Sequence, residues 1–281
     1  MIVECVPNFS EGRDARTIAA LGDSVGPLLL DTTSDPDHNR SVLTFAGPPD
    51  AVADAALAVV GVARERINLV RHAGVHPRLG VADVMPFVPV SGVSLEDCAE
   101  LARDTGVRIW NELRIPVYLY EAAALRPECV RLENVRRLAG TGLAPDFGMG
   151  RHPTAGACVV GARKFLIAWN INLDSPDLAA ARAIARTIRE SSGGLPAVKA
   201  IGLPMESRGQ VQVSINLVDF ERTPLHVVFE AVAAECGKRG IEIGGSELIG
   251  MIPAAALTGH DLKWENMRPE LVLENGLSRI H

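Results

Sequence analysis

Short apolar runs alternate along the chain with longer segments whose apolar residues recur at helical spacing. In the first half, this pattern predicts strands at Ile2–Val6, Leu28–Asp31, Ser41–Ala46, Val84–Val90 and Val117–Tyr120. Helices are predicted at Arg13–Val25, from Pro48 onward, at Leu95–Ile109, and in a region that ends near Leu138. The helix at Leu95 has a clear start, because Ser94 and Asp97 have the spacing of a partial capping box.

The second half repeats the order of the first. It predicts strands at Lys164–Asn172, Val198–Pro204 and Gln210–Val218, with helices at Pro176–Arg189 and Pro224–Cys236. Each half therefore has the order β-α-β-β-α. Hairpins with intervening helices favour an α+β fold, with antiparallel sheets and helices on one face, over a doubly wound parallel sheet. Two such lobes leave a place for ligands between them, and the Gly- and Pro-rich loop 138–156 ends the first lobe.

Composition limits the classes of partner. The chain has 281 residues, 47% hydrophobic and 22% charged, which is typical of a globular protein. With a net charge of −6 and no basic stripe, we expect no nucleic-acid partner. The five cysteines form no CxxC motif, which is typical of buried thiols in a reducing compartment. No signal peptide and no long apolar run is evident, so we expect a cytoplasmic protein that does not contact membranes.

The stretch from Arg71 to Pro89 carries the strongest chemical signal. It places two histidines, two arginines and an aspartate around a loop that precedes an apolar strand. Gly74 and Pro77 disfavour a helix here, so His72 and His76 are not expected to bind a metal from one helix face. His76 is the candidate acid–base, since an imidazole can move a proton near neutral pH. A structural role in the turn is the alternative.

Two further segments could bind ligands. Residues 35–40 combine carboxylate, amide and guanidinium groups, which suit an amino-acid substrate or a solvated loop. Arg40 and Arg78 could each grip a carboxylate with two hydrogen bonds, or could form surface salt bridges. The glycine-rich loop from Gly148 to Gly156 lacks a nucleotide-binding motif, but its glycines allow the backbone to approach a flat ligand. A flexible connection between the lobes is the simpler interpretation of that loop.

Several motifs, in order over nearly the whole chain, resemble one known family. They are Val3–Gly12, Asp37–Val42, Val75–Gly80 with Asp83-Val84, Val117–Tyr120, Ala144–Gly148, Gly161–Leu166 with Asn170–Leu173, Gln212–Leu217 and Gly245–Gly250. On these motifs the chain is identified as a member of the glutamate formimidoyltransferase (formiminotransferase) family. The resemblance is to the stand-alone form, without the cyclodeaminase domain of the animal proteins.

The resemblance implies transfer of the formimidoyl group from N-formimidoyl-L-glutamate to N5 of tetrahydrofolate, a one-carbon step of histidine breakdown. It also implies two ferredoxin-like (β-α-β-β-α-β) lobes at 1–163 and 164–281, a substrate tunnel between them, and a homodimer. Tetrahydrofolate would be the co-substrate, and no metal is expected. Formyl transfer between glutamate and folate is the enzymatic alternative. The non-enzymatic alternative is a folate- or amino-acid-binding protein on the same scaffold.

The family pattern assigns roles to residues of this chain. His76, in the His-Pro-Arg motif, falls on the catalytic histidine. The substrate-binding candidates are Asp35, Asn39, Arg40 and Arg78. The folate-binding candidates are Gly148, Met149, Gly150, Arg151, His152, Pro153, Thr154, Ala155 and Gly156. Thr33 stands where some members carry an aspartate, so Asp35 or Asp37 would have to supply any carboxylate role there.

Overall fold

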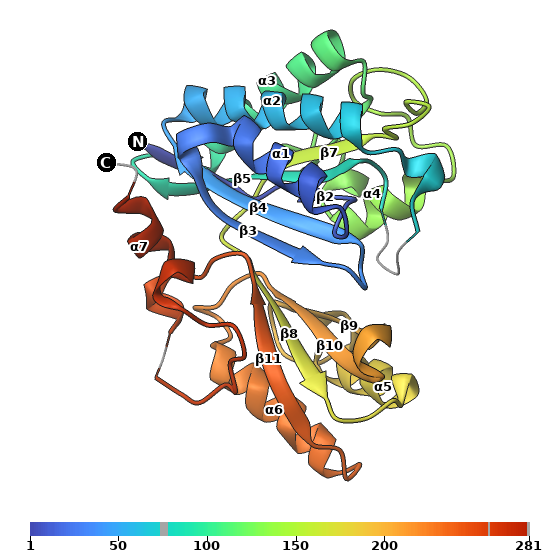
Figure 1. Cartoon of the computed structure of the whole chain (residues 1–281), viewed down its shortest axis with the longest axis vertical. Coiled ribbons are helices and arrows are strands. Elements are labelled where there is room, and N and C mark those ends of the chain that lie inside the picture. The colour runs from blue at the N-terminus through green and yellow to red at the C-terminus, as the bar shows by residue number, and fades with distance from the viewer. Residues whose placement is uncertain (74–77, 258, 280–281) are drawn as a thin grey trace. The chain divides into compact units, whose positions relative to one another are not determined.

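The computed structural model describes residues 1–73, 78–257 and 259–279 of the chain. These residues form a mixed α+β structure with two sheets, divided into two compact units at Lys164 and Phe165 (Figure 1). The first unit contains Met1–Lys164, and the second contains Phe165–Arg279. Each unit has its own apolar core, so each is described separately.

The first unit contains seven strands and four α-helices within its described residues. The strands are β1 (Ile2–Cys5), β2 (Asn8–Phe9), β3 (Leu29–Asp35), β4 (Arg40–Gly47), β5 (Ala82–Ser91), β6 (Val117–Glu121) and β7 (Cys158–Ala162). The helices are α1 (Ala15–Val25), α2 (Pro49–Arg66), α3 (Leu95–Leu113) and α4 (Leu132–Ala139). The predicted loop 32–40 is wrong in length, because β3 and β4 extend into it and leave only residues 36–39 as the turn.

Local sequence explains where these helices begin. Ser94 caps α3 as predicted: its hydroxyl accepts from the Asp97 amide at 3.1 Å, and the Asp97 carboxylate accepts from the Ser94 amide at 2.8 Å. Asp14 caps α1 by accepting from the Arg16 amide at 3.1 Å. Pro49 occupies the first turn of α2, where its missing N–H leaves no bond unmade.

The sheet of the first unit is mixed, which corrects the prediction of antiparallel sheets. β7 runs parallel to both β5 and β6, while β1, β2 and β3 pair antiparallel with β4. The strand β7 was not predicted, because all five of its residues are buried and it has no polar alternation. A parallel strand covered on both faces gives that continuous apolar pattern.

Helices cover both faces of this sheet, where one covered face was predicted. Leu119 on β6 joins the core that α2 and α3 share with Phe45 and Phe87. Its neighbour Tyr118 joins a separate cluster with Val135 of α4. Because successive residues of a strand point to opposite faces, α4 packs on the face opposite to α2 and α3.

The second unit has a simpler order. Its elements are β8 (Ile167–Leu173), α5 (Leu178–Ile188), β9 (Val198–Met205), β10 (Gln210–Leu217), α6 (Leu225–Gly237) and β11 (Ile243–Ile249), followed by the short helix α7 (Leu273–Leu277). The four strands form an antiparallel sheet in the order β11-β8-β10-β9. Both α5 and α6 contribute to one core with Trp169. The predicted strands, hairpin and helices are present within a few residues, and β11 is an additional strand.

The five cysteines are all free and buried, as predicted for small hydrophobic residues. Cys5, Cys98, Cys129 and Cys158 lie in the first unit, and Cys236 lies in the second. Burial raises the pKa of each thiol above its ordinary value, for Cys98 to about 11. These thiols are therefore protonated near neutral pH and do not act as nucleophiles. Among the helices of the described ranges, none is long and apolar enough to cross a membrane.

Candidate active site

The centre of the candidate site is a buried carboxylate between two arginines. The side chain of Asp83, at the start of β5, is completely buried. Its Oδ2 atom accepts from the guanidinium of Arg40 at 2.9 Å and from that of Arg136 at 2.6 Å. Its Oδ1 atom accepts from the Leu79 amide at 2.6 Å. Arg40 also donates from Nε to the Asn8 side chain at 2.9 Å, so the cluster joins β2, β4, β5 and α4.

Electrostatics keep this cluster ionised. Burial alone would raise the pKa of Asp83, but the adjacent guanidinium groups of Arg40 and Arg136 hold that pKa below its ordinary value. The arginines exceed the carboxylate by one charge. A region with this excess attracts an anionic ligand such as an amino-acid carboxylate.

The turn between β3 and β4 is tied to the segment that precedes β5. Asn39 has a left-handed backbone (φ 48°), and its side-chain oxygen accepts from the Gly12 amide at 2.9 Å. Its side-chain amide donates to the Ala73 carbonyl at 3.0 Å. The ring of His72 lies 3.1 Å from the Asn39 carbonyl oxygen and also contacts the guanidinium of Arg78.

The predicted catalytic residue, His76, lies outside the described residues, and its role stays a prediction. Both residues that flank positions 74–77 make contacts. Ala73 is held by Asn39, and Arg78 contacts His72. Ala73 and Arg78 are therefore both linked to the β3–β4 turn, Ala73 directly and Arg78 through His72.

Asp35 ends β3 and is bonded within its own turn. Its carboxylate accepts from the His38 amide at 2.8 Å and lies 3.3 Å from the His38 ring. Burial lowers the pKa of His38, so this ring is neutral near pH 7. The Thr33 hydroxyl donates to the Asp31 carboxylate at 2.9 Å. A carboxylate is therefore present two residues before Thr33, on the same face of β3.

The candidate folate loop folds back on itself. The Nδ1 atom of His152 accepts from the backbone amides of Thr154 at 3.3 Å and Ala155 at 3.0 Å. Burial lowers the pKa of His152, with a smaller contribution from Arg64, which favours the neutral ring that these two bonds require. Met149, Gly150, Arg151 and Pro153 are exposed and could contact a ligand.

The same loop is hydrogen-bonded to the segment after Arg78, so it does not act as a loose connection between units. Gly156 pairs with Gly80 in an isolated bridge, and the Val81 amide donates to the Ala155 carbonyl at 2.9 Å. Gly156 has a positive φ of 72°, and a Cβ there would meet the Leu79 carbonyl. Glycine is required by both the conformation and the space.

The structure thus gathers most of the predicted site residues around one segment, residues 78–83. Arg40 donates to Asp83, the ring of His72 links Arg78 to Asn39, and Gly156 of the glycine-rich loop pairs with Gly80. The roles of these residues in binding stay predictions. No role was predicted for Asp83 or Arg136, although a carboxylate that begins an apolar strand needs a cation if it is buried.

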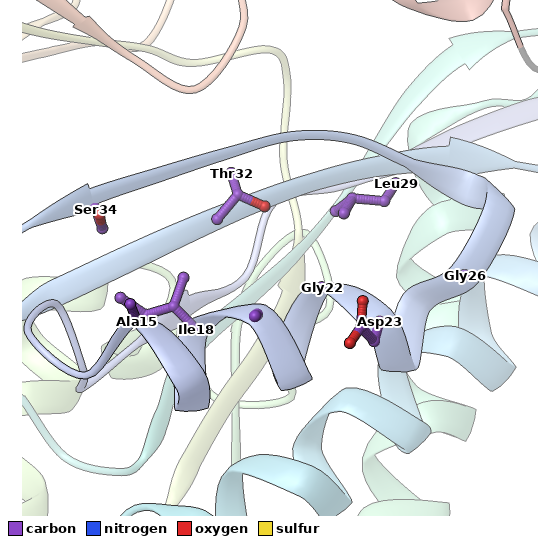
Figure 2. A pocket seen from close by; sticks show the side chains of 9 residues that line it. Ala15, Ile18, Gly22, Asp23, Gly26, Leu29, Thr32 and Ser34 are labelled. Carbon is purple, nitrogen blue, oxygen red and sulfur yellow. The ribbon is translucent and has the colours of Figure 1, made fainter.

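A pocket of the first unit is lined by none of the predicted site residues. Figure 2 shows this pocket of about 550 Å³ between α1 and β3. It is lined by Ala15, Ile18, Ala19, Gly22, Asp23, Gly26, Leu29, Thr32 and Ser34. With one carboxylate and no histidine or arginine, this lining offers no acid–base pair. Within the described ranges, no group of three potential ligands is arranged to hold a metal ion.

Two protein-family models match consecutive parts of the chain. Residues 2–163 match the model of the formiminotransferase domain, N-terminal subdomain, and residues 168–271 match that of the formiminotransferase domain. The chain is 43% identical over 270 residues to a glutamate formimidoyltransferase of Streptococcus pyogenes serotype M1, covering 91% of this chain and 90% of that protein. It is 40% identical to the protein of the same name from Thermoplasma acidophilum, covering 91% and 89% respectively.

A formimidoyltransferase-cyclodeaminase of Mus musculus is 42% identical to this chain. That match covers 91% of this chain and 51% of the mouse protein, so the chain spans about half of its length. The class of protein is therefore an enzyme that transfers a chemical group. More particularly, the chain belongs to the formiminotransferase family, and the family predicted from its motifs is confirmed.

Proposed function

We propose that this protein transfers the formimidoyl group from N-formimidoyl-L-glutamate to N5 of tetrahydrofolate, releasing L-glutamate. The observation that carries the proposal is similarity along nearly the whole chain. Relatives named glutamate formimidoyltransferase are 40% and 43% identical over about nine-tenths of both chains. The cluster around Asp83 supports it, because its excess of arginine suits a substrate with carboxylates.

In the proposed reaction, N5 attacks the amidine carbon and gives a tetrahedral intermediate. N5 then loses a proton, and the nitrogen of the departing glutamate gains one. A neutral His76 would accept the first proton and return it to the leaving group, a contribution of about 10²- to 10⁴-fold. Because the donor amidine is already a cation, positioning of the two substrates would provide much of the remaining rate.

The other site residues are proposed to bind. Asp35, Asn39, Arg40 and Arg78 would orient the amino-acid donor. The exposed part of the loop from Gly148 to Gly156 would contact the folate. Tetrahydrofolate is a co-substrate in this scheme, and the reaction needs no metal. The ferredoxin-like lobes at 1–163 and 164–281, the substrate tunnel and the homodimer stay predictions.

The direct test is an assay of transfer. Purified protein mixed with formimidoylglutamate and tetrahydrofolate should form 5-formimidoyltetrahydrofolate. Acid converts that product to the methenyl form, whose near-ultraviolet absorbance should rise with time. No increase at saturating substrates would reject the proposal. Replacing the donor with N-formyl-L-glutamate in the same assay tests formyl transfer. Binding of tetrahydrofolate without turnover of either donor would indicate the non-catalytic protein.

A further inference from the structure

A carboxylate lies on the first sheet where no structural role accounts for it. Glu4 is in β1, between Ala46 of β4 and Val88 of β5. Its neighbours Val3 and Cys5 both belong to the core shared with α2. Because side chains alternate along a strand, Glu4 points to the opposite face of the sheet, away from α1, α2 and α3.

Glu4 is buried, and none of the described residues donates a hydrogen bond to its carboxylate. Its side chain is 1% exposed, and within the part of the chain that the structure describes neither carboxylate oxygen has a hydrogen-bond partner. The hydroxyl of Thr44, which is two residues from Ala46 on β4 and therefore on the same face, is also buried without a partner among those residues. A buried carboxylate without donors is strongly unfavourable. Such a group is typical of a site completed by a ligand.

The surroundings of Glu4 contain little charge. The strands on either side provide Ala46, Thr44 and Val88. Arg163, which follows β7, is the charged group that acts on Glu4. Burial raises the pKa of Glu4 to about 7, and Arg163 offsets only part of that effect. Near neutral pH, the Glu4 carboxyl is therefore partly protonated.

We propose that Glu4 binds the cationic amidine of the formimidoyl donor and thereby selects it over a formyl donor. This inference rests on the proposed function. An amidinium group presents two N–H donors in one plane, which match the two oxygens of a carboxylate. Its positive charge also neutralises the buried carboxylate, which the neutral ring of a pterin would not do. A formyl donor has a carbonyl oxygen in place of one N–H, and that oxygen would face the carboxylate and be repelled.

The polarity of the sheet face fits such a donor. Arg40, Thr44 and Ala46 lie on one face of β4, because they are separated by even numbers of residues. Arg40 belongs to the arginine-rich cluster, and Glu4 lies beside Ala46. One end of this face is therefore basic and the other acidic. The donor likewise has its γ-carboxylate at the end remote from the cationic amidine.

The proposal predicts release of a proton on binding. Without donor, Glu4 is partly protonated near neutral pH. A bound amidinium would keep the Glu4 carboxylate ionised. With a pKa of about 7, Glu4 should release close to one proton at pH 6, about half at pH 7 and almost none at pH 8.5. Titration calorimetry with formimidoylglutamate alone, in buffers of different ionisation enthalpy, measures this number. Glu4→Gln should lose that pH-dependent release, while the exposed control Glu100→Gln should keep it.

Donor preference is the second measurement. In Glu4→Gln, the side-chain amide can pair with a formyl group but not with both N–H groups of an amidinium. The ratio of kcat/KM for formimidoylglutamate to that for formylglutamate should fall about 10²-fold, because a site with mismatched polar groups discriminates strongly. Glu4→Asp should be intermediate, and circular dichroism should show that every variant is folded.

The outcomes separate this proposal from the function itself. If the wild type transfers no formimidoyl group, the proposed function fails, and this inference fails with it. If the wild type is active but Glu4→Gln keeps both the donor ratio and the proton release, only the role of Glu4 is overturned. If Glu4→Gln lost affinity for tetrahydrofolate but not for the donor, the proposed role of Glu4 would also be overturned. That result would place the pterin, and not the amidine, at Glu4.

Discussion

Replacement of Asp83 by asparagine should lower the free energy of unfolding of the first unit by about 3–5 kcal/mol, because it leaves buried guanidinium groups without a counter-charge. Arg40 and Arg136 both donate to the same oxygen of Asp83, which is fully buried. Chemical denaturation followed by circular dichroism measures the change. The control is Asp104→Asn on the exposed face of α3, which should change stability by less than about 0.5 kcal/mol.

The pH dependence gives an independent check on Asp83. Its pKa in the folded protein lies below the ordinary value of 3.8. The ionised carboxylate therefore adds stability at pH values above 3.8, and this contribution is lost as the pH falls through the folded pKa. The free energies of unfolding of the wild type and Asp83→Asn should show their full difference between pH 5 and 8. The two values should become equal in acid. A constant difference down to pH 2 would contradict the ion-pair explanation.

Replacement of His76 by alanine should reduce turnover by about 10²- to 10⁴-fold, because N5 and the leaving nitrogen would lose their shared acid–base. Binding of formimidoylglutamate and tetrahydrofolate should remain within a few-fold of the wild type. Stopped assays of product formation and equilibrium binding measure the two quantities. This combination distinguishes a chemical role from a structural one.

A matched control for His76→Ala is His260→Ala, in the second unit and exposed. It should leave turnover unchanged. If His76→Ala lost binding and turnover equally, the histidine would hold the loop in place and the acid–base role would be wrong. Unchanged turnover would move the proton transfer to another group.

Local features of this fold were predictable because they depend on nearby residues. The cap formed by Ser94 and Asp97 needs only a spacing of three, and the β9–β10 hairpin is marked by its short polar turn. The strand β7 was missed, since a strand buried on both faces has no alternation. β11 was missed because Gly244 and Gly245, where its register shifts, weaken the strand pattern.

The types of residue in the site were predictable from the sequence. Which side chains contact one another was not. The loop motifs placed Asn39, Arg40 and Arg78 among the candidates, and the structure brings these residues together. Asp83 bonds to side chains 43 and 53 positions away. Glu4 in a short strand gives no sign that its carboxylate is buried without a donor. Such contacts depend on which strands and helices come together in the folded sheet. The periodicity of apolar residues does not show this.

Because all five cysteines are buried, their reactivity can report local opening of the structure. A thiol-specific alkylating reagent can modify these side chains only while the surrounding structure is open. Mass spectrometry of each cysteine peptide would then give an opening rate for its neighbourhood. Cys236 would report on the second unit and the other four on the first, so the two halves could be followed separately in one sample without introducing any label.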